Sequence, residues 1–214
     1  ASTSETYNNP THVPTAEDER LMIPDVTNPR FSYGGGKIAS ELMALHWGGK
    51  RGLEVVIFRP HNVYGPDMGF EHVIPEITQK IVEGSNGLTD KRIALPIQGD
   101  GSETRSFCYV DDGARGARIA GDQGEPGNIY HLGTELEISI KDLILGIAKV
   151  AGVEVEIQAG ELRPGGTPRR CPDITKLRGL GYDPKVSLEE GLQKTVSWYV
   201  EHFLKQRRSG GEAS

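Results

Sequence analysis

Hydrophobic and polar positions alternate with two different periods along the chain, and together they predict an α/β protein. Apolar residues recur at helical spacing in the segments 38–48, 73–83, 139–150 and 187–206. Short apolar runs typical of strands occupy 54–58, 93–98, 105–110, 128–132 and 153–157. Because helix 38–48 is followed at once by the buried run 54–58, we expect the second half of a βαβ crossover within a parallel sheet.

A polar segment, 6–32, precedes the first predicted helix. Its prolines exclude a long helix, so we expect a long loop of the kind that often carries function. The stretch YGGGK at 33–37 then opens the helix with three glycines, although glycine costs a helix interior about 1 kcal/mol relative to alanine. Something other than helix propensity must therefore favour these glycines.

Composition narrows the class of protein. The chain has 214 residues, 36% of them hydrophobic, which is enough to bury one large core or two smaller ones. Its formal net charge of -6 argues against a nucleic-acid surface, but it leaves room for a local basic pocket that holds a phosphorylated ligand. No apolar run approaches the roughly 18 residues of a membrane span, so no contact with a membrane is expected. We therefore expect a protein that acts on a small molecule.

The cysteines and histidines do not predict a metal site. Cys108 and Cys171 lie far apart with no C-x-x-C spacing, so we expect neither zinc nor a disulfide framework, and a reducing cytoplasm is the default location. Cys108 is interpreted as a small buried hydrophobic residue. The histidines, His131 among them, lack ligand spacing and are expected mostly at the edge of the core or on the surface.

Candidate chemistry starts with Tyr33 and Lys37. They are four residues apart, so on a helix their side chains share one face. An ammonium group favours the phenolate beside it, which allows a tyrosine to act as a general base near neutral pH. Taken alone, this spacing is common by chance, and a surface pair is the alternative. A hydroxyl cluster at 2–4, followed by Glu5, supplies the partner expected for hydride transfer to a nicotinamide: a hydroxyl that binds the substrate oxygen while Tyr33 takes its proton.

Five segments in order carry a resemblance to a known family: ASTSE, YGGGK, RPHNVYGP, GDGSETRSFCYVDD and RRCPDI. Together they resemble the extended short-chain dehydrogenase/reductase family, specifically its NAD-dependent nucleotide-sugar epimerases, dehydratases and decarboxylases. The likeness covers residues 1 to about 199.

The resemblance implies an α/β fold with part of a Rossmann-like doubly wound parallel sheet and a smaller C-terminal α/β substrate-binding domain. The segment 1–66 would be the remainder of the NAD-binding domain and carry the catalytic residues. Segment 67–206 would mainly bind the nucleotide sugar, with some segments returning to the Rossmann part, and 207–214 would be a flexible tail.

Catalytic roles carried over from the family fall on five residues. The resemblance implies that Thr3 orients the sugar, that Tyr33 is the catalytic base, and that Lys37 holds the nicotinamide ribose and tunes Tyr33. Ser4 and Glu5 match positions that handle a second proton transfer in dehydrating and decarboxylating relatives. The alternatives are a Thr3 hydroxyl satisfied by the backbone and a solvated Glu5.

The segment RPHNVYGP matches residues that contact cofactor and substrate in the family. The resemblance places Pro60 and His61 beside the nicotinamide and Asn62 on the substrate diphosphate. This segment follows a buried strand, and ligands of doubly wound sheets bind beyond the carboxyl ends of such strands. The alternative is a turn set by Gly65-Pro66 and capped by Asn62.

Two arginines match diphosphate ligands of the family, Arg105 and Arg170. A guanidinium grips phosphate oxygens in a fork, which would explain how an acidic protein holds an anionic ligand. Arg169 is a weaker candidate, and a surface arginine is the alternative for each. The segment 99–101, Gly-Asp-Gly, is also interpreted as a hairpin turn.

The resemblance implies an NAD cofactor, a nucleotide-diphosphate sugar as substrate and a homodimer of the full-length protein. We expect an epimerase that acts through a 4-keto sugar; a 4,6-dehydratase or a UDP-glucuronate-type decarboxylase is the alternative. The family's glycine-rich NAD turn, G-x-x-G-x-x-G, is absent from the sequence. The chain therefore resembles the C-terminal two-thirds of an enzyme, and a truncated, non-catalytic sugar-nucleotide-binding module is a further alternative. The glycines of YGGGK would allow close approach to the nicotinamide ribose or to a neighbouring loop, or would leave the turn loose.

Overall fold

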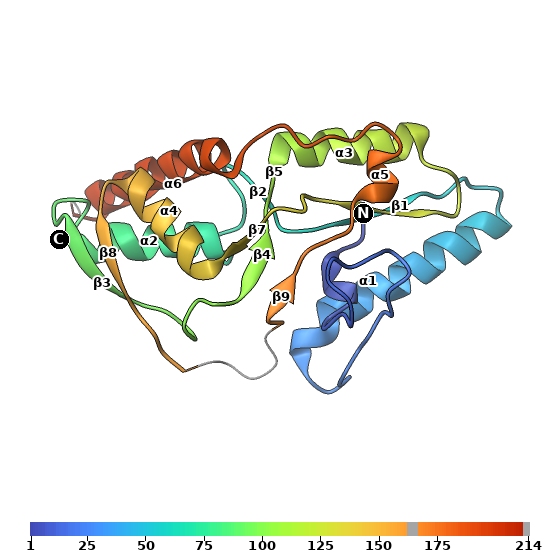
Figure 1. Cartoon of the computed structure of the whole chain (residues 1–214), viewed down its shortest axis with the longest axis horizontal. Helices are drawn as coiled ribbons and strands as arrows, with labels where there is room; N and C mark the ends of the chain where they lie inside the picture. The colour runs from blue at the N-terminus through green and yellow to red at the C-terminus, as the bar shows by residue number, and fades with distance from the viewer. Residues whose placement is uncertain (162–166, 212–214) are drawn as a thin grey trace. The chain divides into compact units, whose positions relative to one another are not determined.

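The computed structural model describes residues 1–161 and 167–211, and the chain divides into two compact units (Figure 1). The first unit comprises 1–63, 105–137 and 169–185, and the second comprises 64–104, 138–168 and 186–214. The chain thus crosses between the units several times. The cofactor and substrate roles expected for 1–66 and 67–206 stay predictions.

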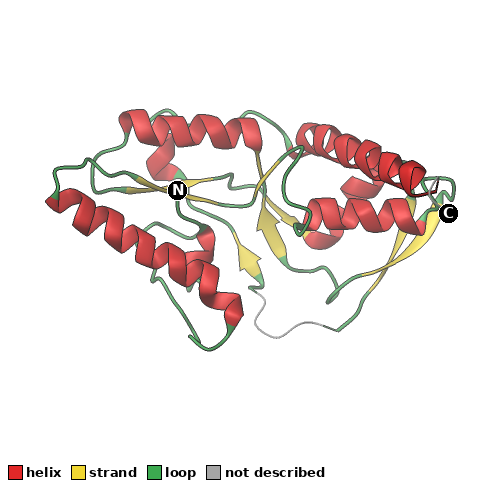
Figure 2. Ribbon diagram, turned by 180° about the vertical axis from the view of Figure 1, so that it is seen from behind, coloured by secondary structure: helices red, strands yellow, loops and turns green. Residues whose placement is uncertain are grey.

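A parallel strand pair forms the centre of the first unit. Strand β1 (Ile57–Pro60) pairs with β6 (Ile129–Leu132), in register from Ile57 opposite Ile129 to Pro60 opposite Leu132. Helix α3 (Val110–Gln123) lies on one side of this pair and α1 (Ser32–Leu42) on the other (Figure 2). The short α5 (Thr175–Arg178) packs against β6. The buried side chains between the strands, α3 and α5 are those of Cys108, Ala120, Tyr130, Leu132, Ile174, Leu177 and Tyr182. The expected α/β fold with a parallel sheet is confirmed, as is the burial of Cys108.

The first predicted helix begins earlier than the hydrophobic pattern indicates. A 3-10 turn, η1 (Ser4–Thr6), is followed by the long loop, a second turn η2 (Pro29–Phe31), α1 (Ser32–Leu42) and a π-helical continuation η3 (Met43–Gly48). The Asn28 side chain accepts a hydrogen bond from the Arg30 amide at 3.0 Å and Pro29 occupies the first helical position, so the turn before α1 is capped. The helix therefore starts at Ser32 and includes the three glycines.

Three helices and a second parallel pair build the second unit. Helices α2 (Val73–Gly84), α4 (Ile140–Ala151) and α6 (Leu188–Gly211) pack on one another, and β3 (Arg92–Pro96) pairs with β8 (Glu154–Gln158). Ser139 caps α4 as its sequence predicts, because its hydroxyl accepts from the Asp142 amide at 3.0 Å. Helix α6 continues through 207–211, which were expected as a tail, and 212–214 lie outside the described residues.

Short strands complete the described structure. β2 (Val63–Tyr64) pairs with β5 (Cys108–Tyr109), and β4 (Thr104–Ser106), β7 (Glu137–Ser139) and β9 (Arg169–Arg170) form a sheet in the order β7-β4-β9. The interpretation of 99–101 as a hairpin turn is wrong. Strand β3 before it pairs with β8 rather than with β4 after it, so the turn joins strands of different sheets.

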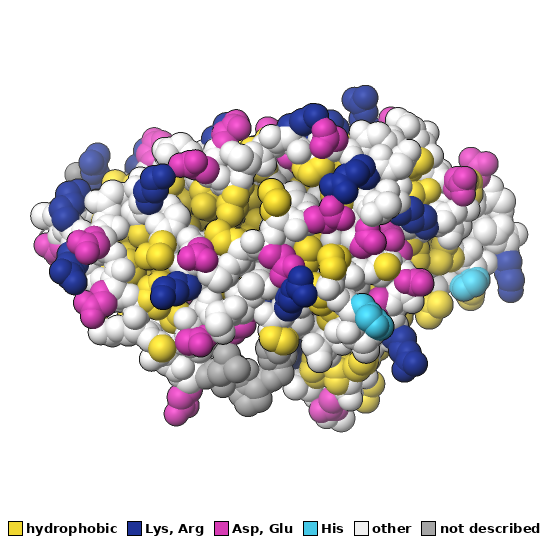
Figure 3. All heavy atoms as spheres, in the orientation of Figure 1, with side chains coloured by type: hydrophobic (Ala, Val, Ile, Leu, Met, Phe, Trp, Pro, Cys, Tyr) yellow, Lys and Arg dark blue, Asp and Glu magenta, His cyan; other side chains and the backbone are white. Residues whose placement is uncertain are grey.

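Acidic and basic side chains are interspersed over the face drawn in Figure 3, with hydrophobic groups between them. Within 1–161 and 167–211, no helix has the combination of length and apolar character that crossing a bilayer requires. Over the same residues, no cluster of three or more His, Cys, Asp or Glu side chains could hold a metal ion.

Candidate active site

One face of α1 docks on the segment 1–5 and brings together two motifs that are far apart in the sequence. Gly34, Lys37 and Glu41 are spaced three and four residues apart, so they share this face. The Lys37 ammonium donates to the Ala1 carbonyl at 3.0 Å. A Cβ atom built on Gly34 would lie 2.8 Å from the Glu5 carbonyl oxygen, so helix and segment are in direct backbone contact. The two elements that carry Thr3 and Tyr33 are therefore neighbours.

Thr3 and Ser4 lie at the start of η1 and are buried. Thr3 is the N-cap: its side-chain oxygen accepts from the Glu5 amide at 3.3 Å. This bond is the backbone contact weighed as the alternative for Thr3, but it uses only a lone pair of the oxygen. The hydroxyl hydrogen of Thr3 is not consumed by it, and it remains a donor for a substrate oxygen.

Tyr33 and Lys37 lie on the same side of α1, as their spacing predicts. The Lys37 nitrogen is 6.0 Å from the centre of the Tyr33 ring. Tyr33 is 57% exposed and lines a cavity of about 220 Å³ together with Glu5, Asn8, Met22, Arg30, Phe31 and Gly34. The phenol is thus open to a reactant, and an acidic and a basic side chain border the same cavity.

Glu5 and Arg170 form an ion pair, which unites a candidate proton-transfer residue with a candidate diphosphate ligand. The Arg170 side chain is 12% exposed and that of Glu5 is 46% exposed. The interpretation of Arg170 as an ordinary surface arginine is therefore wrong. Because each charge neutralises the other, a ligand anion that binds Arg170 competes with Glu5.

The other polar candidates have structural partners. Arg169 forms a bidentate ion pair with Glu137, with its Nε 2.8 Å from one carboxylate oxygen. The Asn62 side-chain amide donates to the Ser106 carbonyl at 2.8 Å, and its backbone has a positive φ of 40°, so it fixes the turn after β1. Arg105 lies in β4 and is partly buried. Only Arg170 among these residues contacts the segment 1–5 through a described ion pair.

His61 follows Pro60, the last residue of β1, and its ring is enclosed. Its amide donates to the Leu132 carbonyl at 2.8 Å, while both ring nitrogens are buried without a hydrogen-bond partner among the described residues. Burial lowers the pKa of His61 well below 6.5, and the nearby charges of His131, Arg170 and Arg59 lower this pKa further. The imidazole is therefore neutral.

A buried polar network beneath the site was missed in the sequence. Arg59 forms a bidentate ion pair with Glu41, at 2.8 Å and 2.6 Å, and donates to the Tyr7 hydroxyl at 2.5 Å. The Tyr7 hydroxyl is 2.6 Å from His131 Nε2, and His131 Nδ1 is 3.1 Å from the Asp173 carbonyl. A carbonyl can only accept, so Nδ1 carries the hydrogen and Nε2 accepts from Tyr7. A chain of hydrogen bonds therefore runs from α1 through β1 to β6.

The pKa shifts in this network keep Glu41 ionised and His131 neutral. Burial alone raises the pKa of Glu41, but the hydrogen bonds from Arg59 and its charge outweigh it, so the pKa is lowered from 4.5. Burial lowers the pKa of His131 to about 4. The expectation that His131 lies at the core edge or surface is wrong, because the residue is fully buried. A charged Arg59 within the apolar run VVIFRP was the signal that could have revealed the network.

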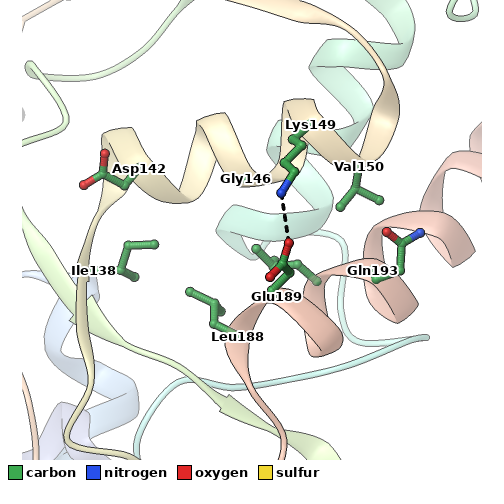
Figure 4. A pocket seen from close by; sticks show the side chains of 9 residues that line it. Ile138, Asp142, Gly146, Lys149, Val150, Leu188, Glu189 and Gln193 are labelled. Carbon is green, nitrogen blue, oxygen red and sulfur yellow. Dashed lines mark hydrogen bonds and ion pairs between the residues drawn. The ribbon is translucent and has the colours of Figure 1, made fainter.

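A second cavity, of about 510 Å³, lies in the second unit between α4 and α6 (Figure 4). Its apolar walls include Ile138, Leu188 and Leu192. Lys149 and Glu189 reach toward each other across it and form an ion pair of 2.9 Å. None of the residues predicted to act on a substrate lines this cavity.

A family model, the NAD dependent epimerase/dehydratase family, matches residues 1–133. The chain is 32% identical over 203 residues to a dTDP-glucose 4,6-dehydratase of Streptomyces griseus, an alignment that covers 94% of the chain and 58% of the relative. It is 33% identical to a UDP-N-acetyl-alpha-D-glucosaminuronate decarboxylase of Bacillus cytotoxicus, covering 94% of the chain and 63% of the relative. The chain thus spans less than two thirds of the length of these curated relatives.

Solved structures that resemble this chain include enzymes of the same kind. The UDP-glucuronic acid 4-epimerase of Bacillus cereus, in complex with UDP-glucuronic acid and NAD, superposes with a TM-score of 0.80. It is 26% identical, and the match covers 94% of this chain and 60% of that one. The similar proteins therefore include dehydratases, a decarboxylase and an epimerase, all of which act on nucleotide sugars.

Proposed function

Because the chain belongs to the NAD-dependent epimerase/dehydratase family, we propose that it carries the catalytic and substrate-binding residues of a nucleotide-sugar 4-epimerase. The observation that supports this most directly is the docking of α1 on the segment 1–5. It places Thr3 and Tyr33 on neighbouring elements, and Arg170 is tied to the same segment through Glu5.

The residues present fit the nicotinamide-ribose end of NAD. Tyr33 is exposed, and a Cβ on Gly36 would meet nothing within 4 Å, so the surface beside Lys37 is open. The Lys37 ammonium has three hydrogens and gives one to the Ala1 carbonyl, which leaves donors for a ribose. Lys37 would hold the ribose, and the neutral His61 beside Pro60 would border the nicotinamide. Hydride acceptance and return is the chemistry that bound NAD supplies.

The protein's own residues would handle the proton and the substrate. The Thr3 hydroxyl would donate a hydrogen bond to the sugar oxygen at C4. Tyr33 would take the proton of the sugar C4 hydroxyl as the 4-keto sugar forms. Arg170, with Arg105 and Asn62, would hold the diphosphate so that the keto sugar can turn without leaving. After the turn, Tyr33 would give its proton back to the C4 oxygen, and the hydride returned by bound NAD would reach the opposite face of C4, which inverts the configuration.

Epimerisation makes the fewest demands on Glu5. A 4,6-dehydratase or a decarboxylase needs further proton transfer at the sugar, and the Glu5 carboxylate would be its natural agent. In this structure that carboxylate is engaged with Arg170. Epimerisation at C4 needs no second acid or base, so it can proceed whether Glu5 stays paired with Arg170 or is displaced by the substrate diphosphate.

Turnover by the full-length protein in deuterium oxide tests the proposal. We expect a 4-epimer of an NDP-hexose or NDP-hexuronate substrate without incorporated deuterium, because the hydride removed from C4 is the one that returns. A 4-keto-6-deoxy product carrying deuterium at C5, or a pentose that has lost carbon dioxide, would instead identify a dehydratase or a decarboxylase. Mass spectrometry of the product distinguishes all three, and Tyr33→Phe is the control that should abolish each of them.

A further inference from the structure

The three consecutive glycines of α1 have different surroundings. A Cβ on Gly34 would lie 2.8 Å from the Glu5 carbonyl oxygen and 3.3 Å from its carbon. A Cβ on Gly35 would meet only the tip of the Ile23 side chain, at 3.2 Å, and one on Gly36 would meet nothing within 4 Å. The Ile23 side chain can rotate away, whereas the Glu5 backbone cannot. Gly34 is therefore the glycine that this turn requires.

The carbonyl that faces Gly34 is held in place from its other side. It accepts from the Asn8 amide at 3.3 Å, and the amides of Thr6 and Tyr7 bond the carbonyls of Thr3 and Ser4 at 3.4 Å and 3.2 Å. The turn η1 is thus a closed set of hydrogen bonds with little freedom to retreat. A methyl group at position 34 would instead push α1 outward, by about 0.5 Å if normal contact distances are restored.

We propose that Gly34 is a positioning residue, which sets the distance between the Thr3 hydroxyl on η1 and the Tyr33 phenol on α1. Tyr33 is its direct neighbour, so any displacement of the first turn moves the phenol. Lys37 and Glu41 hold the same face of the helix farther along, so the displacement tilts the first turn instead of shifting the helix as a whole. The consequence for turnover rests on the proposed function; the consequence for docking does not.

Alanine at each glycine in turn provides matched variants. Gly36→Ala should raise Tm, because alanine favours the helix and the position is open, whereas Gly34→Ala should lower it. In hydrogen exchange, the amides of Thr6, Tyr7 and Asn8 should lose protection in Gly34→Ala and keep it in Gly36→Ala. Equal protection in both variants overturns the proposal, whatever the activity of the protein. If Gly34→Ala does not fold, hydrogen exchange in the unmodified chain tests the proposal. Amides of η1 that exchange freely while those of the first turn of α1 are protected would show that the two elements do not dock.

Kinetics separates positioning from mere stability. For Gly34→Ala we expect kcat to fall by about 10-fold to 100-fold while KM changes by less than about threefold, since a misplacement of this size affects the reacting groups and not the diphosphate ligands. Thr3→Val should cost much less in the Gly34→Ala background than alone, because the distance it depends on is already lost. Equal costs, or a kcat equal to that of the unmodified protein, would show a purely structural role. These rates are measured on the full-length protein, and a full-length protein without turnover would refute the proposed function and leave the exchange experiment to judge Gly34.

Discussion

At the scale of single residues, the ion pair of Glu5 and Arg170 changes what each side chain is expected to do. The resemblance implies proton transfer for one and phosphate binding for the other, as independent residues. In the structure they neutralise each other, with Arg170 mostly buried. A diphosphate can therefore bind Arg170 only by displacing or sharing the carboxylate, which makes Glu5 a competitor for the ligand site.

Replacement of Glu5 by glutamine should accordingly strengthen nucleotide-diphosphate binding. We expect Kd for UDP or dTDP to fall severalfold in Glu5→Gln, because Arg170 loses its competing anion. Arg170→Gln should raise Kd, by tenfold or more, since a charged hydrogen bond contributes about 1.5–3 kcal/mol. Calorimetry measures both, and Glu137→Gln, which releases the neighbouring Arg169, is the matched control that should leave Kd unchanged. Weaker binding in Glu5→Gln contradicts the competition.

The residues that the sequence predicted are those whose chemistry shows in the local spacing. Tyr33 and Lys37 share a helix face as four-residue spacing requires, and the segment that carries Thr3 contacts α1 through Ala1 and Glu5. The pairing of Glu5 with Arg170 could not be predicted, because 165 positions separate them and either charge could have met solvent. The burial of His131 was not predicted, because a histidine in a short strand gives no sign that the distant Tyr7 hydroxyl bonds its ring.

At the scale of elements, one buried ion pair joins α1 to the sheet. Glu41 is on the face of α1 that carries Lys37, and Arg59 is in β1; both side chains are nearly inaccessible to solvent. The pair of Lys149 and Glu189 between α4 and α6 has a single contact at the comparable distance of 2.9 Å, but its side chains are 77% and 82% exposed. Burial, rather than distance, should separate their contributions to stability.

Glutamine at each carboxylate provides the comparison. Glu41→Gln leaves the Arg59 charge buried without its counter-ion, so we expect a loss of about 3–5 kcal/mol in the free energy of unfolding. Glu189→Gln should leave the free energy of unfolding nearly unchanged, because the exposed pair is screened by solvent. Urea unfolding monitored by circular dichroism measures both. A Glu41→Gln variant as stable as Glu189→Gln would show that the buried pair does not hold α1 against β1.

Some element boundaries can be predicted from the local sequence, whereas others are set by contacts with distant residues. Ser139 identified the start of α4 because a helix cap is local. The start of α1 was placed too late, since the glycines hid a first turn that Asn28, Pro29 and the contact with Glu5 stabilise. The hairpin expected at 99–101 failed for the opposite reason: a turn sequence constrains the bend, whereas the partner of β3 is set by β8, far along the chain.

At the scale of the whole molecule, the buried histidine of the first unit makes folding sensitive to acid. His131 faces Tyr7, Arg59 and the Asp173 carbonyl, and its pKa is lowered to about 4 chiefly by burial. As the pH falls below about 6.5, the unfolded chain binds a proton that the folded chain does not, so stability decreases down to the folded pKa. His61, whose pKa is also lowered, acts in the same direction.

Replacement of His131 should therefore flatten the pH dependence of stability. Between about pH 6.5 and pH 4, we expect the slope of the unfolding free energy to decrease by up to about 1.4 kcal/mol per pH unit in His131→Asn, even though that variant is less stable at neutral pH. Urea titrations across the range measure the slope. His12→Asn is the control, because the His12 side chain is 87% exposed. An unchanged slope in His131→Asn would mean that His131 is protonated in the folded protein.

The distribution of binding residues along the chain leads to a last prediction, about ligands. The candidates for the nucleotide diphosphate, Asn62, Arg105 and Arg170, all lie in the first unit, together with the candidates for the nicotinamide ribose. The sequence lacks a glycine-rich turn to hold the cofactor diphosphate, and Lys37 with Tyr33 can contact only one end of NAD. The 214-residue chain should therefore bind a nucleotide sugar in calorimetry and show no heat with NAD at the same concentration. Arg170→Gln should abolish the first signal. Tight binding of NAD by this chain would show that other residues replace the glycine turn, and turnover by the chain alone would exclude the interpretation as a non-catalytic binding module.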